Sequence, residues 1–193
     1  MPDSMLACAG GSVLVMIDIQ ERLAAAMVPA ARTGVYRNAR ILLEAAARLG
    51  VPVLATEQYP QGLGRMPDEL VEALPAGTPR LEKTCFSCHG AQQFMSALEA
   101  AGRPQVILAG MEAHVCVLQS ALELRAAGRQ VFAVEDACCS RNQQNHANAM
   151  HRMRAAGVTV TNTESVLFEW LRDARHEHFK AISALLKQAA RDG

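Results

Sequence analysis

The sequence predicts a single α/β domain whose doubly wound, Rossmann-like sheet of six parallel strands carries helices on both faces. Two observations lead to this fold. An alanine-rich helical stretch that ends in Gly and runs into a short β-branched segment occurs four times along the chain. The chain has 193 residues, which is enough for one domain with a substantial core and short for two.

Each copy of this pattern joins the end of a helix to the start of a strand. Gly closes a helix because it tolerates the left-handed backbone conformation that follows the last helical residue. The apolar run behind it is typical of a strand buried on both faces of a parallel sheet. The four copies are Gly50 before 51–54, Gly102 before 106–108, Gly128 before 131–134 and Gly157 before 158–160.

The remaining elements follow from shorter signals. The apolar run 13–17 predicts the first strand, and a shorter strand is expected around Leu81 and Glu82. Residues 58–79 are rich in Pro and Gly and predict a long irregular loop of the kind that is usually functional. The domain is therefore expected to cover 1–193, with a core at about 12–170 and an amphipathic C-terminal helix at about 173–190.

Composition argues against several classes of function. Nineteen basic residues balance nineteen acidic ones and no basic run occurs, so we expect no binding to nucleic acid or to an anionic membrane. No segment approaches the roughly 20 apolar residues that a membrane helix needs. The six cysteines are not needed as disulfides in a chain this rich in aliphatic residues, so we expect reduced thiols and a cytoplasmic protein.

Reactive side chains follow several predicted strands. Ligands bind at the carboxyl ends of the strands in an open parallel sheet. Asp18 follows the first strand, Lys83 follows the strand around Leu81, and Cys116 comes soon after the third apolar run. An acid, a cation and a thiol are thus expected at one edge of the sheet. Further polar residues expected at this edge are Thr56, Glu57, Glu135 and Asp136.

Cys116 lies six residues past Gly110, about where a strand-to-helix turn ends and a helix begins. A thiol in the first helical turn lies near the positive end of the helix dipole and near unpaired N–H groups, which favour a thiolate and can hold an oxyanion. Lys83 would add a cation, and Asp18 could accept the thiol proton. We therefore expect a thiol pKa below the ~8.5 of free Cys and first reaction with iodoacetamide among the six cysteines.

The same residues also have ordinary structural interpretations. A free Cys is most often a small buried hydrophobe, Asp18 could cap the following helix, and Lys83 could be a solvated surface amine. His114 would be the partner in a conventional Cys–His pair. Two residues before Cys116, however, its side chain is expected to point away from the thiol.

Three motifs occur in order along the chain: Val-Met-Ile-Asp-Ile-Gln at 15–20, Leu-Glu-Lys-Thr at 81–84 and Gly-Met-Glu-Ala-His-Val-Cys-Val at 110–117. In this order and spacing they resemble the isochorismatase-like cysteine hydrolase family over roughly residues 12–170. The segment Thr-Glu-Gln-Tyr-Pro at 56–60, with Gly-Leu-Gly at 62–64, is similar to the subgroup often named isochorismatase domain-containing proteins.

The resemblance implies a six-stranded parallel sheet and a catalytic triad of Asp18, Lys83 and Cys116. In the implied mechanism the thiolate attacks an amide-like or acyl carbonyl and water cleaves the resulting thioester. The implied oxyanion segment is Met111, Glu112 and Ala113, with a non-proline cis peptide at Met111–Glu112. Residues assigned to the substrate pocket are Gln20, Glu57, Tyr59 and His114.

The sequence also departs from parts of this family. Nicotinamidases carry histidines of a metal site after the second strand, where this chain has Glu57, Gln58 and Tyr59, so we expect no metal and no cofactor. True isochorismatases lack the catalytic Cys, so Cys116 indicates C–N or acyl cleavage of a small-molecule substrate. The apolar C-terminal segment and the resemblance together predict a homo-oligomer.

Two other classes of function stay open at this point. The same fold could serve as a catalytically silent oligomeric binding or scaffold protein. Cys85 and Cys88 form a C-x-x-C that could act in thiol–disulfide exchange, or as half of a zinc site with His89. Cys138 and Cys139 are expected to pack in a loop at the active edge.

Overall fold

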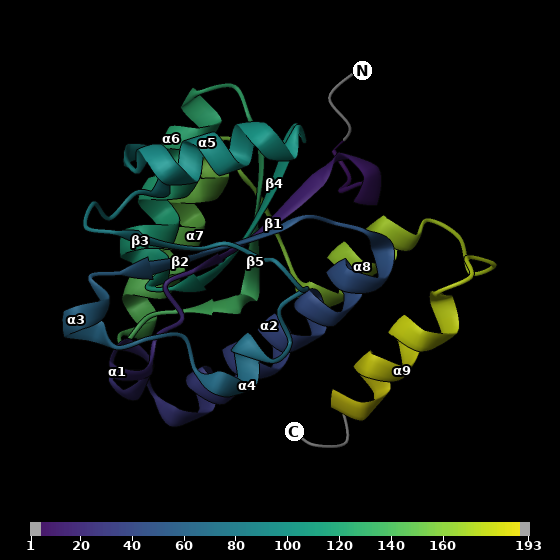
Figure 1. The fold of residues 1–193 in the computed structure, drawn as a ribbon, viewed down its shortest axis with the longest axis horizontal. Coiled ribbons are helices and arrows are strands. Elements are labelled where there is room, and N and C mark those ends of the chain that lie inside the picture. Colours follow the sequence, from purple (N-terminus) through teal and green to yellow (C-terminus); the bar gives the residue numbers. More distant parts are fainter. Residues whose placement is uncertain (1–4, 190–193) are drawn as a thin grey trace.

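A computed structural model of the chain describes residues 5–189. Six parallel strands form one sheet in the order β3-β2-β1-β4-β5-β6 (Figure 1), which confirms the doubly wound sheet that the sequence predicts. The strands are β1 Ser12–Ile17, β2 Val53–Gln58, β3 Arg80–Lys83, β4 Gln105–Met111, β5 Gln130–Cys139 and β6 Thr159–Thr161.

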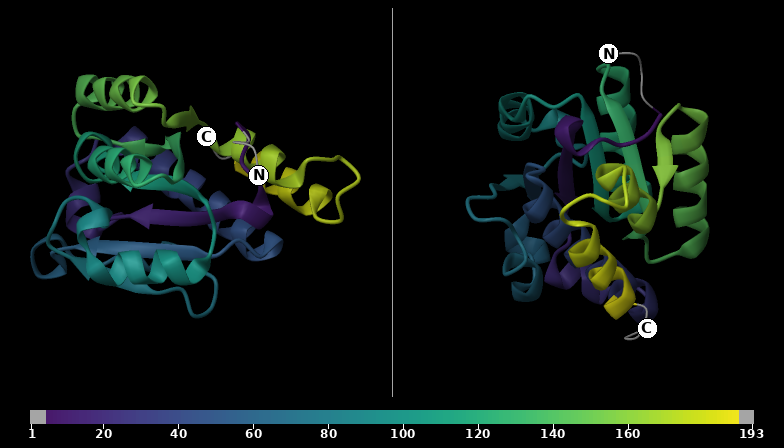
Figure 2. Two further views of the ribbon diagram at one scale, coloured as in Figure 1. Left: turned by 90° about the horizontal axis from the view of Figure 1, so that it is seen from above. Right: turned by 90° about the vertical axis from the view of Figure 1, so that its right-hand side faces the viewer.

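Helices cover both faces of this sheet. One layer holds α5, α6 and α7, and the opposite layer holds α2 with α8 and α9 beside it (Figure 1, Figure 2). The helices are α1 Glu21–Ala25, α2 Pro29–Leu49, α3 Pro60–Leu63, α4 Asp68–Val71, α5 Gln92–Ala101, α6 Leu118–Ala126, α7 Gln143–Ala155, α8 Thr163–Leu171 and α9 Phe179–Ala189. Three short turns complete the fold: the 3-10 turns η1 Ala9–Gly11 and η2 Cys88–Gly90, and the π-helical turn η3 Ala113–Val117.

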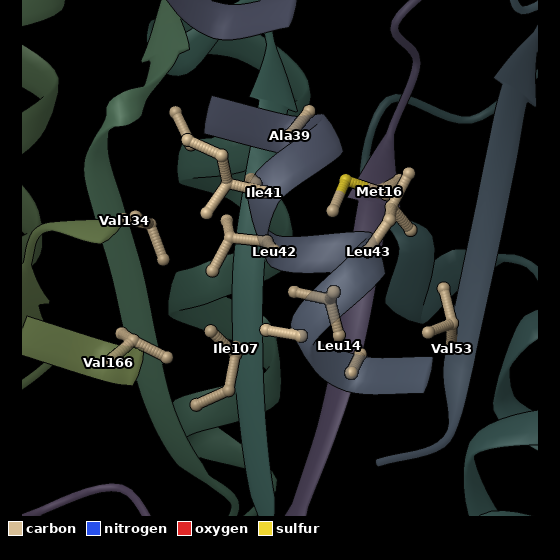
Figure 3. Packing of buried hydrophobic residues seen from close by; sticks show 14 of the residues in the cluster. Leu14, Met16, Ala39, Ile41, Leu42, Leu43, Val53, Ile107, Val134 and Val166 are labelled. Atoms are coloured by element: carbon tan, nitrogen blue, oxygen red, sulfur yellow. The ribbon is translucent and has the colours of Figure 1, made fainter. Parts of the chain in front are cut away.

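The sheet separates two hydrophobic cores, and the side chains of the central strand β1 point into both of them. Alternate residues of a strand point to opposite faces, so Leu14 and Met16 pack against α2 while Val15 and Ile17 pack against the other layer. Figure 3 shows Leu14 and Met16 beside Leu42 and Leu43 of α2. All six residues of β1 are buried. This packing fixes the position at which the chain leaves the strand and hence the position of the next residue, Asp18.

The glycine pattern is confirmed at all four positions. Each of these glycines ends a helical segment and has a positive φ, as a left-handed helix end requires. The φ values are 64° for Gly50, 63° for Gly102, 84° for Gly128 and 79° for Gly157.

Strand β5 is longer than the sequence predicts. It continues past Val134 to Cys139. The register of β5 with β4 shifts between Leu108 and Gly110, and the two strands pair again beyond this irregularity. Cys138 and Cys139 are therefore buried within a strand, and the prediction that they pack in a loop is wrong.

Glu135 and Asp136 lie in this irregular part of β5. Glu135 pairs with Arg154 of α7 at 2.5 Å, and Asp136 accepts hydrogen bonds from the backbone N–H and the hydroxyl of Thr163 at 2.8 and 2.9 Å. Both carboxylates thus contact helices that pack on the sheet, and their place at the active edge stays a prediction.

The C-terminal helix begins later than predicted, at Phe179 rather than at 173. Arg172 has a φ of 63°, which ends α8, and the Asp173 carboxylate accepts a hydrogen bond from the N–H of Arg175 at 2.8 Å in the turn that follows. The predicted end at 190 lies outside the described residues.

The apolar face of α9 packs within the chain. Ile182 is buried in the α2-side core, and Leu185 and Leu186 pack against it. This face therefore gives no free surface for a second copy. Within residues 5–189, none of the helices is long and apolar enough to cross a membrane.

Candidate active site

The candidate site lies where the winding of the sheet reverses, at the carboxyl ends of β1 and β4. Ligands of doubly wound folds bind at this point. The register places Ile17 beside Thr56 of β2 on one side and beside Gly110 of β4 on the other. Asp18, which follows Ile17, is therefore held between the strand that carries Thr56 and the turn that leads to Cys116.

The structure brings Asp18 and Lys83 into direct contact. The Lys83 Nζ donates to Asp18 Oδ2 at 2.6 Å, and both side chains are buried. The other carboxylate oxygen, Asp18 Oδ1, accepts a hydrogen bond from the hydroxyl of Thr56 at 2.7 Å. The carboxylate is thus held by two hydrogen-bond donors inside the protein, and Lys83 is no surface amine.

Four acceptors surround the ammonium of Lys83. Besides Asp18, Nζ donates to Gln58 Oε1 at 2.8 Å and lies 3.0 and 3.2 Å from the carbonyl oxygens of Phe86 and Cys85. Burial is the largest single influence and lowers the pKa of Lys83, but the negative charge of Asp18, the neighbouring Cys116 and Cys88 and the hydrogen bond to Asp18 together raise it above its ordinary value. An ammonium has three N–H donors. They are taken up by protein acceptors, so Lys83 acts here as a fixed counter-ion.

Cys116 lies in η3, near enough to the same carboxylate for the two groups to interact electrostatically. The residue is only 4% exposed. Burial raises the pKa of the Cys116 thiol well above its ordinary value, and the negative charge of Asp18 raises it further, while Lys83 acts in the opposite direction. The predicted lowering of this pKa is therefore wrong. The resting site holds a neutral thiol beside an ion pair.

This raised pKa predicts the pH dependence of Cys116 alkylation. Only the thiolate reacts with iodoacetamide, and at any pH below a raised pKa the thiolate fraction still increases with pH. We expect the Cys116 rate to climb from about pH 6 to about pH 9 without a plateau, measured by peptide mapping after timed labelling. The exposed Cys8 should be modified before Cys116 at neutral pH. A Cys116 rate that levels off below about pH 8 would contradict this assignment.

The turn between β4 and η3 has an unusual backbone. The peptide bond between Met111 and Glu112 is cis, as the resemblance implies. The N–H groups of Val115 and Val117 donate to the Glu112 carbonyl oxygen at 3.1 and 3.3 Å. Ala113 begins η3, and the N–H groups of a first helical turn have no partner within the helix. Donors of this kind at the start of η3 are available to an acceptor at the strand end.

Gly110 is required by the close approach of β1. Its φ is 146°, and a Cβ at this position would lie 2.0 Å from the carbonyl oxygen of Ile17. We expect Gly110→Ala to lower the free energy of unfolding by about 3 to 5 kcal/mol, from backbone strain and overpacking together.

Urea unfolding followed by circular dichroism measures this effect. Gly50→Ala is the matched control, because its φ is 64° but no atom lies within 4 Å of the added Cβ. Gly50→Ala should lower the free energy of unfolding only by the strain of a left-handed residue, about 1 to 2 kcal/mol. Equal losses of unfolding free energy in the two variants would contradict the role given to the close approach of β1 at Gly110.

Two of the predicted pocket residues hold the 58–79 loop. The Gln20 amide donates to the carbonyl oxygens of Gln58 and Gly64 at 3.0 and 2.6 Å, and it accepts from the Gln58 N–H at 2.7 Å. The Glu57 carboxylate pairs with Arg65 at 2.6 Å and accepts from the Met66 N–H at 3.0 Å. The polar atoms of both side chains are thus committed to the loop. A role in substrate binding stays a prediction.

The other two predicted pocket residues, Tyr59 and His114, have described contacts with residues other than Cys116. Tyr59 is 55% exposed, and its N–H donates to the Lys83 carbonyl oxygen at 2.8 Å. The ring of His114 contacts Ser140 through Nδ1 at 3.0 Å and Asn145 through Nε2 at 3.4 Å. Because these contacts direct the ring toward β5 and α7, His114 does not form a Cys–His pair with Cys116.

The carboxylate of Glu112 is also committed. It accepts from the N–H of Arg141 at 2.9 Å and pairs with the guanidinium of the same residue at 3.3 Å. Glu112 therefore contributes to the site through its backbone.

Sequence reasoning missed two neighbours of the ion pair. Gln58 contacts Lys83 directly, and the Cys88 thiol lies 3.9 Å from the Thr56 hydroxyl. The sequence predicts Gln58 in the 58–79 loop, whereas β2 extends to this residue, so Thr56 and Gln58 are two residues apart on one face of a strand. Cys88 had no comparable signal, since η2 follows a loop.

The C-x-x-C segment does not have the properties of a reactive dithiol. Cys88 is buried, and burial raises the pKa of its thiol to about 11. Cys85 is partly exposed, and both thiols are free. Among residues 5–189, no group of three or more His, Cys, Asp and Glu side chains could hold a metal ion.

A surface cavity of about 710 Å³ lies elsewhere, between α2, α9 and the segment around α4. It is lined by charged residues of both signs, among them Arg32, Glu44 and Glu69. None of Asp18, Lys83 and Cys116 lines it. The candidate chemistry is therefore at the sheet edge rather than in this cavity.

Comparison with known proteins identifies the family. Residues 12–165 match the isochorismatase domain. Isochorismatase domain-containing protein 2 of Danio rerio is 40% identical over 184 residues, which cover 94% of this chain and 90% of that protein. The MAR1 ribonuclease structure from Caenorhabditis elegans is 33% identical with a TM-score of 0.88, over 94% of this chain and 92% of that chain.

A second solved structure is similar to the same extent in fold. YcaC from Pseudomonas aeruginosa, with hexane-2,5-diol and covalent acrylamide, is 28% identical with a TM-score of 0.88, over 96% of this chain and 94% of that chain. Sequence and fold agree over nearly the whole chain, so this protein belongs to the isochorismatase domain family and has the hydrolase fold of that family.

Proposed function

We propose that this protein is a cysteine hydrolase that cleaves a small amide-like or acyl substrate through a thioester on Cys116. The observation that carries the proposal is the buried ion pair of Asp18 and Lys83 at 2.6 Å, which lies close enough to the buried Cys116 thiol to act on its pKa. A nucleophile, a base within hydrogen-bond reach and a third group that orients the base are the features of covalent catalysis.

The first half of the reaction forms the thioester. Asp18 takes the proton of the Cys116 thiol as the sulfur attacks the substrate carbonyl, and the carbonyl oxygen becomes an oxyanion. N–H groups at the start of η3 stabilise this oxyanion. The C–N bond then breaks, and Asp18 returns the proton to the leaving amine. Because the resting thiol is neutral, proton transfer to Asp18 accompanies the attack.

The second half releases the acid. Asp18 accepts a proton from water as the water oxygen adds to the thioester carbonyl. The C–S bond breaks, the carboxylic acid leaves, and the Cys116 sulfur recovers its proton from Asp18. The sum is an amide and water converted to an acid and an amine. Lys83 keeps the Asp18 carboxylate charged between these two steps.

An ammonia-release assay on a panel of small primary amides tests this proposal, with Cys116→Ala as the blank. Turnover of at least one amide that is lost in the blank supports it. Acrylamide provides a second test, because the similar YcaC structure contains covalent acrylamide. An acrylamide adduct on the peptide that contains Cys116, located by peptide mapping apart from any adduct on the exposed Cys8, is expected. Release of ammonia by the blank at the wild-type rate would overturn the proposal.

The alternatives from other classes have less support. A silent scaffold would not need the buried Asp18–Lys83 pair beside a thiol. A thiol–disulfide enzyme would need an accessible, acidic thiol, and Cys88 is buried with a raised pKa. Insulin reduction by the wild type that disappears in Cys85→Ser would favour that second class. The ribonuclease name belongs to the C. elegans protein, and this chain's balance of 19 basic and 19 acidic residues gives no support for polyanion binding.

We also propose that the protein acts as a homo-oligomer in the cytoplasm, a compartment that keeps thiols reduced. Tyr59 and Phe86 are 55% and 54% exposed, and both flank Lys83 through backbone hydrogen bonds. Exposed aromatic side chains of this kind are typical of contact surfaces. Sedimentation at micromolar concentration tests the proposal, and a monomer alone would contradict it.

A further inference from the structure

Strand β2 contacts both members of the buried ion pair from outside the triad. Thr56 donates its hydroxyl to Asp18 Oδ1 at 2.7 Å, and Gln58 accepts from Lys83 Nζ at 2.8 Å. The two residues lie on the same face of the strand because they are two positions apart. One strand therefore holds the negative and the positive charge in register.

Thr56 fixes the orientation of the Asp18 carboxylate. Lys83 binds one carboxylate oxygen and Thr56 binds the other, so rotation of the carboxylate would break a charge-assisted hydrogen bond. The Asp18 backbone is held by the same neighbour, since its N–H donates to the Thr56 carbonyl oxygen at 3.1 Å. The Asp18 carboxylate near Cys116 is consequently held in a single orientation.

Gln58 fixes the ammonium of Lys83 in the same way, and the Gln58 side chain is itself held in place. Its Nε2 donates to the Thr84 carbonyl oxygen at 2.6 Å, and its backbone N–H donates to Gln20 Oε1 at 2.7 Å. The side-chain oxygen is therefore aimed at Lys83 by the hydrogen bond of its own amide nitrogen and by the backbone contact. A preorganised acceptor of this kind keeps the cation beside Asp18.

We propose that Thr56 and Gln58 are the positioning residues of this site, which hold Asp18 and Lys83 in the geometry that proton transfer from Cys116 requires. The inference rests on the proposed cysteine hydrolase function. Neither residue needs to touch the substrate, so their loss should lower kcat and leave KM nearly unchanged.

Thr56→Val tests the first half, since Val keeps the branched shape and removes the hydroxyl. Loss of one hydrogen bond to a charged group should lower kcat about 10- to 100-fold, with KM within about twofold of the wild type. Thr56→Ser keeps the hydroxyl and should recover most of kcat. Gln58→Met is an independent variant for the second half and should lower kcat by a similar factor.

The assay is the ammonia release of the purified chain, normalised to the folded fraction from circular dichroism, with Cys116→Ala as the blank. If the blank is inactive while Thr56→Val and Gln58→Met keep the wild-type kcat, the positioning role alone is overturned. A fall in kcat that only follows the folded fraction, or that Thr56→Ser does not reverse, overturns it as well. If the blank is as active as the wild type, the proposed function falls and the inference falls with it.

Discussion

Replacing Cys116 with Ala will lower turnover by about 10⁴-fold or more, because the variant loses the atom that forms the covalent intermediate. The neighbouring groups cannot substitute for it. Every donor of Lys83 is engaged by protein acceptors, and His114 contacts Ser140 and Asn145 rather than the site. The measurement is kcat/KM on the best amide of the panel.

Cys138→Ala is the matched control for this loss. Cys138 is also a buried free thiol whose pKa is raised by burial, but it lies within β5 near the Leu108 carbonyl oxygen. The control should keep activity within a few-fold of the wild type after correction for stability, since it removes a thiol of similar burial without touching the ion pair. Comparable losses in both variants would contradict the assignment of Cys116 as the nucleophile.

Much of the fold was predictable because its signals are local. Gly50 and Gly157 mark helix ends that need a left-handed residue, and the β-branched runs behind them have few alternatives to buried strands. The convergence of Asp18 and Lys83 was also predictable, since all parallel strands end at the same edge of a sheet. These inferences depend on chain order and backbone conformation rather than on details of packing.

The electrostatics of the site could not be predicted in the same way. The sequence places a cation, an acid and a thiol near one another, but it does not say how deeply they are buried. In the structure burial is the largest influence on Cys116 and reverses the expected direction of its pKa. The bulge in β5 was equally hidden, because Glu135 and Asp136 look like residues of a strand end until the register with β4 is known.

The hydrogen-bond partners of the polar side chains could not be predicted from the sequence either. Gln20 and Glu57 follow or lie in strands near the active edge, which made them reasonable pocket residues. Their oxygens instead bind backbone N–H groups and Arg65 of the 58–79 loop. Such choices are decided by where a loop folds back, and a single sequence carries no periodic signal for that.

Removing Lys83 should lower both the stability of the fold and the catalytic activity. Lys83→Met leaves the Asp18 carboxylate without its counter-ion in a fully buried position, where the two groups lie 2.6 Å apart in the wild type. Breaking a buried ion pair by removing one partner costs about 3 to 5 kcal/mol, because the remaining charge is left without compensation. Urea unfolding at neutral pH should show this loss, and ammonia release should fall to the level of the Cys116→Ala blank.

The double variant Asp18→Asn with Lys83→Met separates the charge from the packing. Asn keeps the shape of Asp and removes its charge, so the double variant contains no unpaired ion. Its loss of unfolding free energy should be smaller than that of Lys83→Met alone by about 2 kcal/mol, since neutral replacement of a buried pair is often tolerated. Activity should stay absent in the double variant, because the base is gone. If Lys83→Met costs less than about 1 kcal/mol, the pair would behave like an exposed salt bridge, and the role of Lys83 as a buried counter-ion would be contradicted.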